Sequence, residues 1–246
     1  SRIKMLEKLK AVEPVKARRE WRFEFPVPER TPEHLIDIEH LKLGYGDHVV
    51  LNDVMLTIRA GDRVGVLGVN GAGKSTLIKA IADTLTPMAG TLRRGQGLVI
   101  GYFAQHQLEQ LDLTSSPTVR EQELRDWLGK FRFSGDFADA KIDRFSGGEK
   151  ARLALALIAW DKPNLLVLDE PTNHLDMATR EALTLALSQF EGALLLVSHD
   201  RHLLRSTCDK LILVHDGACG EYDGDLDDYA ALVLEHRKSV LEADRA

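Results

Sequence analysis

Short apolar runs separated by glycine-containing turns fill the first part of the chain. Residues 35 to 68 hold three strand-like runs, LIDIEHLKL, VLNDVMLTI and DRVGVLG, punctuated by the turns GYGD and RAGD. A glycine-rich loop and a helix-like stretch follow to residue 85, and strand-like runs return at 91 to 103. The pattern predicts a β-rich beginning that leads into a strand–loop–helix unit.

The rest of the chain alternates between helix-like and strand-like runs. A mainly helical, charged stretch spans about 110 to 161, and the strand-like runs NLLVLDE, GALLLVS and KLILVHD are separated by helix-like segments. A last helix is expected at about 225 to 245. Strands that alternate with helices favour a parallel sheet covered by helices. We therefore expect an α/β fold with a parallel core, into which the stretch at 110 to 161 is inserted as a helical lobe.

The N-terminal residues follow a different pattern. Apolar residues at helical spacing over 3 to 12 predict a helix that ends before a proline. Aromatic and charged residues then alternate from Trp21 to Phe25, which predicts an extended segment. We expect residues 1–30 to be a helical, basic linker end with an extended lead-in, and residues 31–246 to form one nucleotide-binding domain.

Composition narrows the class of protein. With 246 residues, 44% of them hydrophobic, the chain is long enough to bury a full core. Its two cysteines, Cys208 and Cys219, lack disulfide-framework or metal-binding spacing, which favours a structural role and a reducing compartment. No apolar run approaches the roughly 18 residues of a membrane span, and the N-terminus has no signal-peptide core. The first residue is Ser rather than Met, which is compatible with a piece of a longer protein.

Charge is unevenly distributed along the chain. Residues 1 to 22 carry eight basic and three acidic side chains, a local charge of +5, whereas the whole chain carries −6. The remaining residues therefore carry −11. A basic arm on an acidic body fits an arm that contacts phosphate while the body does not, and it fits a solvated helix face equally well.

The stretch GVNGAGKS, Gly68 to Ser75, matches the P-loop pattern G-x-x-x-x-G-K-[ST] and lies between a β run and a helix-like run. Its backbone N–H groups are suited to curl around a β-phosphate at a helix N-terminus, while the lysine reaches the phosphate oxygens and the serine hydroxyl ligates Mg²⁺. An incidental glycine-rich turn does not explain the strand and helix on either side. The residues expected to bind nucleotide here are Gly68, Asn70, Gly71, Ala72, Gly73, Lys74, Ser75 and Thr76.

Two carboxylates end the buried run LLVLDE. Asp169 and Glu170 stand at the carboxyl edge of the predicted strand, where open α/β sheets bind ligands. Asp169 is placed to hold Mg²⁺, and Glu170 to polarise the attacking water. Alone, Asp-Glu is also an ordinary polar strand end, and the P-loop is what favours the catalytic interpretation.

The stretch FSGGEKARLALALIAW, residues 145 to 160, has a strongly helical composition but begins with Gly147 and Gly148. Each glycine costs a helix roughly 1 kcal/mol relative to alanine. Ser146 and Glu149 form an S-x-x-E capping box that secures the helix start. The cap does not explain the glycines, because larger residues would permit the same cap.

In their order, GVNGAGKS, FSGGEKAR, LLVLDEPTNHLD and LLVSHD resemble the nucleotide-binding domain of ATP-binding cassette (ABC) ATPases, over about residues 35 to 225. The resemblance implies a P-loop NTPase fold of the ABC type, with an N-terminal antiparallel β subdomain and an inserted helical signature lobe. It implies that two cassettes sandwich two ATP molecules head to tail. Ser146, Gly147 and Gly148 would then contact the ATP held by the partner cassette, and only residues without Cβ let a phosphate approach that backbone closely.

The same resemblance assigns further roles. Gln105 would join the Mg²⁺ and water network, and His199 would contact the γ-phosphate. Asp176 would be the D-loop aspartate, and Tyr45 would stack on adenine. A lone Gln, His or Tyr is more often structural, so these assignments depend on the order of the motifs around the P-loop.

A closer resemblance is to the ABC-F subfamily, whose members are soluble, carry two cassettes in one chain and lack a transmembrane part. Its basis is EPTNHLD, with Asn173 and His174 where transporter cassettes usually carry small residues, together with SRIKMLEKL at the start and DGDLDDY near the end. The resemblance implies the second cassette, with the tail of the linker, of a cytoplasmic translation factor that binds the ribosome and reaches toward tRNA. The catalytic partner would be a second cassette, in the same full-length chain or in a second copy.

Three other classes of protein share part of this pattern. An ATP-binding subunit of a transporter with separate membrane subunits would share every catalytic residue, but NHLD and the basic lead-in argue against it. An SMC-like or DNA-repair ATPase needs a long coiled coil between the nucleotide motifs, and Ser75 and Ser146 are only 71 positions apart. A non-catalytic scaffold is disfavoured because all residues expected to catalyse are present.

Overall fold

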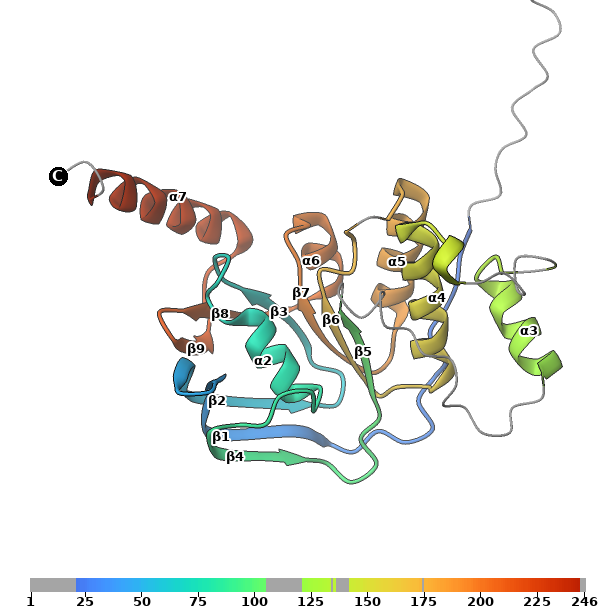
Figure 1. Ribbon diagram of the computed structural model, residues 1–246, viewed down its shortest axis with the longest axis horizontal. Coiled ribbons are helices and arrows are strands. Elements are labelled where there is room, and N and C mark those ends of the chain that lie inside the picture. Colours follow the sequence, from blue (N-terminus) through green and yellow to red (C-terminus); the bar gives the residue numbers. More distant parts are fainter. Residues whose placement is uncertain (1–20, 105–120, 134, 136–141, 174, 244–246) are drawn as a thin grey trace, which may run out of the picture.

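Two β-sheets and the helices around them make up the fold (Figure 1). The computed structural model describes residues 21–104, 121–133, 135, 142–173 and 175–243. The helix predicted within residues 1–20, the basic side chains before Trp21, and Gln105 and His174 lie outside the described residues.

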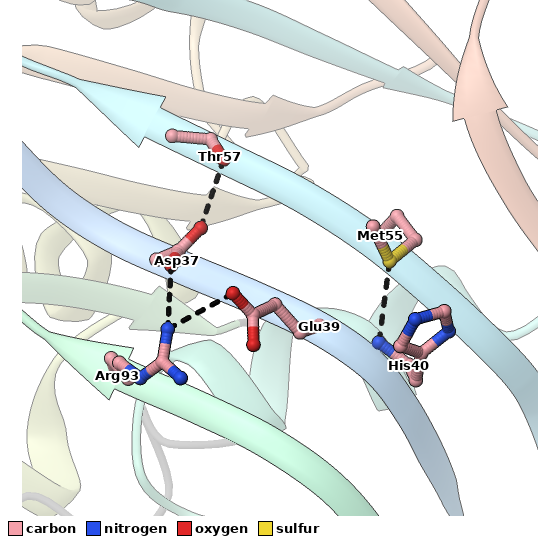
Figure 2. Close-up of polar contacts among 6 residues, drawn as sticks. All are labelled: Asp37, Glu39, His40, Met55, Thr57 and Arg93. Carbon is pink, nitrogen blue, oxygen red and sulfur yellow. Dashed lines mark hydrogen bonds and ion pairs between the residues drawn. The ribbon is translucent and has the colours of Figure 1, made fainter.

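The smaller sheet is antiparallel and has the strand order β2-β1-β4. Its strands are β1 (His34–Tyr45), β2 (His48–Arg59) and β4 (Ala89–Arg94). Polar contacts cross all three strands on its exposed face (Figure 2): the Arg93 guanidinium pairs with Glu39 at 3.0 Å and with Asp37 at 3.3 Å, and Asp37 accepts a hydrogen bond from the Thr57 hydroxyl at 3.0 Å. Exposed pairs of this kind each contribute below about 1 kcal/mol, so the buried face carries most of the stability of this sheet.

The larger sheet has the order β5-β6-β7-β3-β8-β9, and all its neighbouring strands are parallel except the last pair. Its strands are β3 (Arg63–Leu67), β5 (Ile100–Ala104), β6 (Leu165–Asp169), β7 (Ala193–Val197), β8 (Lys210–His215) and β9 (Ala218–Glu221). The predicted parallel core and antiparallel subdomain are both confirmed.

Strand β9 was not predicted from the sequence. Its residues, ACGE, are mostly exposed and have no apolar alternation. The strand forms because Asp216 and Gly217, with φ values of 48° and 76°, make a tight hairpin turn that returns the chain along β8. The Asp216-Gly217 pair in the sequence could have predicted this hairpin.

The described helices are α2 (Lys74–Ile81), α3 (Glu121–Lys130), α4 (Gly147–Trp160), α5 (Met177–Gln189), α6 (Arg201–Thr207) and α7 (Leu226–Ala243), with a 3-10 turn at Ile142–Arg144. The helix predicted to run to residue 85 ends earlier, at Ile81. Asp83 has a φ of 63°, and the N–H groups of Thr84 and Leu85 donate to the Lys79 carbonyl, which closes the helix with a left-handed turn.

Two apolar cores lie on opposite faces of the larger sheet. Along β6, Leu165 and Val167 face the core shared with α2 and the antiparallel sheet, whereas Leu166 and Leu168 face the core shared with α4, α5 and α6. A parallel strand buried on both faces reads as a continuous apolar run. This accounts for the run LLVL and leaves polar residues only at the strand end, where the site lies.

The lead-in from Trp21 to Phe25 joins the helical lobe to the body of the domain. Trp21, Phe23 and Phe25 are buried while the residues between them are exposed, as the alternation predicts, although this segment is not assigned as a strand. The Trp21 indole N–H donates to the Lys130 carbonyl at 2.9 Å, at the end of α3, and Phe25 packs edge-on against Phe190, at the end of α5. The predicted boundary at residue 31 remains a prediction.

Candidate nucleotide-binding site

The P-loop connects β3 to α2 through glycines that other residues could not replace. Gly68 has a φ of 152°, and a Cβ on it would lie 2.5 Å from the Val214 carbonyl oxygen. Gly73 has a φ of 108° and would place a Cβ 2.9 Å from Leu51. Gly73 is also the N-cap of α2 and has no capping side chain, so no side chain occupies the place of an anion at this helix end.

Lys74, the first residue of α2, turns back toward its own loop. Its Nζ donates hydrogen bonds to the carbonyl oxygens of Gly68 at 2.7 Å and Val69 at 3.0 Å. Burial lowers the pKa of the ammonium, and the nearby carboxylates of Glu170 and Asp169 offset part of that shift. The amine therefore lies inside the loop, with the acid pair close enough to influence it.

Glu170 follows β6 in a conformation that non-glycine residues rarely adopt, with a φ of 51°. Its carboxylate lies against His199: the His199 backbone N–H donates to Oε2 at 3.4 Å, and His199 Nε2 is 3.6 Å from Oε1. Oε1 is buried and has no hydrogen-bond partner among the described residues. Burial raises the pKa of Glu170, Asp169 adds to the rise, and His199 and Lys74 counteract it. A strained residue with an unpaired buried oxygen is typical of functional sites.

These groups share one cavity of about 390 Å³. It is lined by parts of the P-loop and of α2, by the end of β6 and by the residues that follow β7. The predicted site residues that line it are Asn70, Gly71, Gly73, Lys74, Ser75, Thr76, Asp169, Glu170 and His199. The strand order explains their proximity, because β6, β7 and β3 are neighbours and their carboxyl ends meet at one edge.

Tyr45 lies at the end of β1 and does not line this cavity. Its ring is 47% exposed, and the ammonium of Lys79, on α2, lies 5.9 Å from the ring centroid. The ring is therefore accessible beside the helix that begins at the P-loop. Gly68 and Ala72 belong to the loop without lining the cavity, and Gln105 lies outside the described residues.

Ser146, Gly147 and Gly148, which are predicted to contact the ATP of a partner cassette, lie away from the P-loop cavity. Ser146 caps α4: its hydroxyl accepts from the Glu149 N–H at 3.3 Å, and the Glu149 carboxylate accepts from the Ser146 N–H at 2.7 Å, which confirms the predicted capping box. Ser146 and Gly147 are exposed, Gly148 is half-buried, and none of them lines the P-loop cavity.

Asp176 has a local structural role. Its carboxylate caps α5 by accepting from the Thr179 N–H at 2.8 Å, and this hydrogen bond lowers the pKa of the carboxyl. Asp176 does not line the P-loop cavity either.

One contact to the P-loop was not predicted from the sequence. The Tyr229 hydroxyl accepts a hydrogen bond from the Gly68 N–H at 3.1 Å. The two residues are 161 positions apart, and no local pattern marks Tyr229 as a neighbour of the loop.

A parallel sheet with a P-loop at its carboxyl edge, beside an acidic strand end, defines the class of P-loop nucleotide-binding domains. The particular family follows from the sequence. The chain belongs to the ATP-binding cassette family: the family model described as ABC transporter matches residues 51–173, half of the chain.

Similar curated proteins are of the ABC-F type. The probable ATP-binding protein YheS of Escherichia coli K12 is 51% identical over all of this chain, which covers 40% of that protein. ATP-binding cassette sub-family F member 3 of Mus musculus is 38% identical over 96% of this chain and 35% of its own length. GCN20 of Saccharomyces cerevisiae is 36% identical over 96% of this chain, which covers 33% of GCN20. The chain thus spans two fifths or less of these relatives.

Solved structures confirm the fold. The ATP-binding cassette MJ0796, determined as a dimer in a post-hydrolysis state bound to ADP and Pi, matches with a TM-score of 0.63 and 23% identity, over 78% of this chain and all of that chain. An ATP-binding subunit of an ABC transporter matches with a TM-score of 0.62, over 81% of this chain and 99% of that chain. No helix in the described part of the chain combines the length and apolarity of a membrane span.

Proposed function

We propose that this chain binds and hydrolyses ATP as one cassette of an ABC-F protein. The observation that carries the proposal is the shared cavity, in which a P-loop lysine, a strained and half-buried glutamate and a histidine converge at one sheet edge. Membership of the ABC family supports the binding of ATP, and the geometry of the cavity supports its hydrolysis.

Each group has a role in this proposal. The N–H groups at the start of α2 bind the phosphates, and Lys74 leaves its two loop carbonyls to contact the β- and γ-oxygens. Glu170, unprotonated, polarises the attacking water, and His199 contacts the γ-phosphate on which charge develops. Tyr45 offers an exposed ring to adenine.

The oxygen donors also suit Mg²⁺. Ser75 and Asp169 line the same cavity and supply a hydroxyl and a carboxylate, the ligands a hard cation prefers. These two residues would hold the ion together with Gln105, and Mg²⁺ when bound would neutralise charge on the phosphates.

A second cassette completes the site in this proposal. Ser146, Gly147 and Gly148 would contact the ATP on the partner's P-loop, with Asp176 at the interface between the cassettes. Three observations support this: the capped start of α4 is accessible, it is separate from the chain's own cavity, and a related fold has been determined as a dimer. The relatives are more than twice as long as this chain, which leaves room for another cassette in the same polypeptide.

For the whole protein we infer a ribosome-associated translation factor of the cytoplasm, in which ATP closes the cassettes and hydrolysis releases them. The ABC-F relatives support this inference, and the basic residues 2 to 22 suit a salt-dependent attraction to RNA phosphates and tRNA. The alternative is an ATP-binding subunit of a transporter, to which the description of the family model points.

One experiment tests both levels: the full-length Glu170→Gln protein is assayed for ATPase activity and sedimented with ribosomes, with and without ATP. We expect turnover to fall roughly 10²-fold or more as the general base is lost, and the ATP-held closed state to sediment with ribosomes. Glu181→Gln, at an exposed position on α5, is the control and should match wild type. Unchanged turnover in Glu170→Gln would contradict the hydrolytic role, and lost turnover without ATP-dependent sedimentation would favour the transporter subunit.

A further inference from the structure

Helix α7 contacts the P-loop through the side chain of Tyr229. Tyr229, on its first turns, accepts a hydrogen bond from the Gly68 N–H at 3.1 Å. We propose that Tyr229 is a positioning residue of the nucleotide site: its hydroxyl holds the first residue of the P-loop and so sets the affinity for the nucleotide phosphates. This inference rests on the proposed function, because it concerns the same site.

Gly68 is constrained on three sides. Its N–H is bound by Tyr229, its carbonyl accepts from Lys74 Nζ at 2.7 Å, and the Val214 carbonyl leaves no room for a Cβ. When Lys74 turns toward phosphate it gives up the Gly68 carbonyl. The hydrogen bond that the Gly68 N–H donates to Tyr229 then remains to keep the start of the loop in place.

Tyr229 is itself held firmly enough to act in this way. Its ring packs edge-on against Tyr222, with the centroids 6.3 Å apart, and neighbouring Leu226 is buried. Burial raises the pKa of the Tyr229 phenol, so the group that accepts from the Gly68 N–H is a neutral hydroxyl.

Helix α7 also pairs with α6, the helix that follows His199. Asp227 pairs with Arg205 at 2.6 Å and with Arg201 at 3.5 Å, both on α6, and α6 begins two residues after His199. A groove of about 580 Å³ is lined by residues of α7, by the P-loop and by His199, and Tyr229 makes a polar contact across it. Helix α7 therefore contacts both the P-loop and the helix that follows His199.

Loss of the hydroxyl should weaken binding without impairing chemistry. Tyr229→Phe keeps the ring but leaves the Gly68 N–H unpaired, and a loop that adopts its binding geometry for only part of the time binds in proportion to that fraction. We expect the Kd of this chain for a fluorescent ATP analogue to rise about 5- to 10-fold. In the full-length protein KM should rise by a similar factor while kcat stays near wild type, because Glu170 and His199 belong to other segments.

Two further variants make the test selective. Tyr222→Phe removes a hydroxyl from the ring that packs against Tyr229, leaves the acceptor for the Gly68 N–H in place, and should bind nucleotide like wild type. Lys74→Ala should abolish binding. Thermal unfolding without nucleotide shows that each variant is folded at the temperature of the titration.

The outcomes separate the two proposals. Weaker binding in Tyr229→Phe, with Tyr222→Phe unchanged, supports the positioning role. If Tyr229→Phe binds like wild type while Lys74→Ala does not, the positioning role is overturned and the nucleotide site stands. If Lys74→Ala also binds like wild type, the nucleotide does not occupy the P-loop and both proposals fail.

Discussion

Glu170 is held in a state that folding alone disfavours. It combines a φ of 51°, a buried Oε1 that has no hydrogen-bond partner among the described residues, and a pKa raised by burial. Each of these costs stability, and each suits a base that must stay desolvated beside a phosphate. We therefore expect the protein to be less stable with Glu170 than with a neutral residue at this position.

The Glu170→Gln variant tests this cost in the absence of nucleotide. Because the folded-state pKa is raised, the carboxyl stabilises the fold most fully when protonated, below the ordinary glutamate pKa, and that stability is lost as pH rises through the raised value. Gln imitates the protonated form, so the variant should unfold at a higher temperature than wild type at pH 8. The gain should be roughly 2–4 °C for each kcal/mol of penalty removed.

The pH dependence identifies the cause. The difference in Tm between Glu170→Gln and wild type should shrink as pH falls and vanish near pH 4, at about the ordinary pKa of a glutamate. The control is Glu181→Gln, at an exposed position on α5, whose Tm should match that of wild type at pH 8. A Glu170→Gln protein that is less stable than wild type at pH 8 would show that the carboxylate is a net stabiliser of the fold.

At the scale of the element, α4 combines a strong start with a weak first turn. The capping box of Ser146 and Glu149 fixes where the helix begins, and the buried alanines and leucines beyond it pack on the sheet. Gly147 and Gly148 remain unfavourable for this helix because glycine has a low helix propensity. The helix itself therefore gains nothing from the two glycines.

Gly148→Ala should separate stability from activity. Replacing a helical glycine should raise the free energy of unfolding of this chain by up to about 1 kcal/mol, as measured by denaturant unfolding. ATPase activity of the full-length protein should fall, because in the proposed two-cassette site the new Cβ would stand where the phosphate of the partner's ATP approaches.

Gly129→Ala, near the end of α3, is the matched control. A Cβ at Gly129 meets nothing within 4 Å, so this variant should gain comparable stability and keep its ATPase activity. Equal activity in both alanine variants would argue that the glycines of α4 serve no partner site.

At the scale of the whole molecule, the aromatic lead-in binds the helical lobe to the domain body. Trp21 stacks on Phe23 with ring centroids 5.1 Å apart, Phe23 lies 5.0 Å from Phe131, and Phe25 reaches Phe190. The chain that enters the domain is thus packed on the lobe that carries the signature helix.

Trp21→Ala should weaken this attachment. Removing a buried indole and its hydrogen bond to Lys130 should lower the free energy of unfolding by about 3 kcal/mol, measured by denaturant unfolding. Amide exchange in α3 should accelerate more than exchange in β6. Val27→Ala, in the same segment but 64% exposed, should leave both measurements unchanged. Uniformly faster exchange throughout the domain would contradict a specific link to the lobe.

Local features were predictable because they depend on a few neighbouring residues. The P-loop between β3 and α2, the acidic end of β6 and the cap of α4 all lie where the sequence places them, since turn chemistry, capping and strand burial leave local patterns. Predictions failed where a local signal was weak: α2 ends before residue 85, and β9 forms from a mostly exposed run after an Asp-Gly turn. The roles of Tyr45, Asp176 and the signature residues remain predictions.

The sequence by itself determined the class of fold, the nucleotide loop and the acidic pair, because periodicity and motif spacing are written along a single stretch of chain. Only the tertiary structure decided which distant groups meet. It placed His199 against Glu170, the Tyr229 hydroxyl on the Gly68 N–H, and Trp21 on the helical lobe. The physical reason is that such contacts depend on strand order and on the packing of helices across the sheet, and residues 29 to 161 positions apart leave no periodic signal of their proximity.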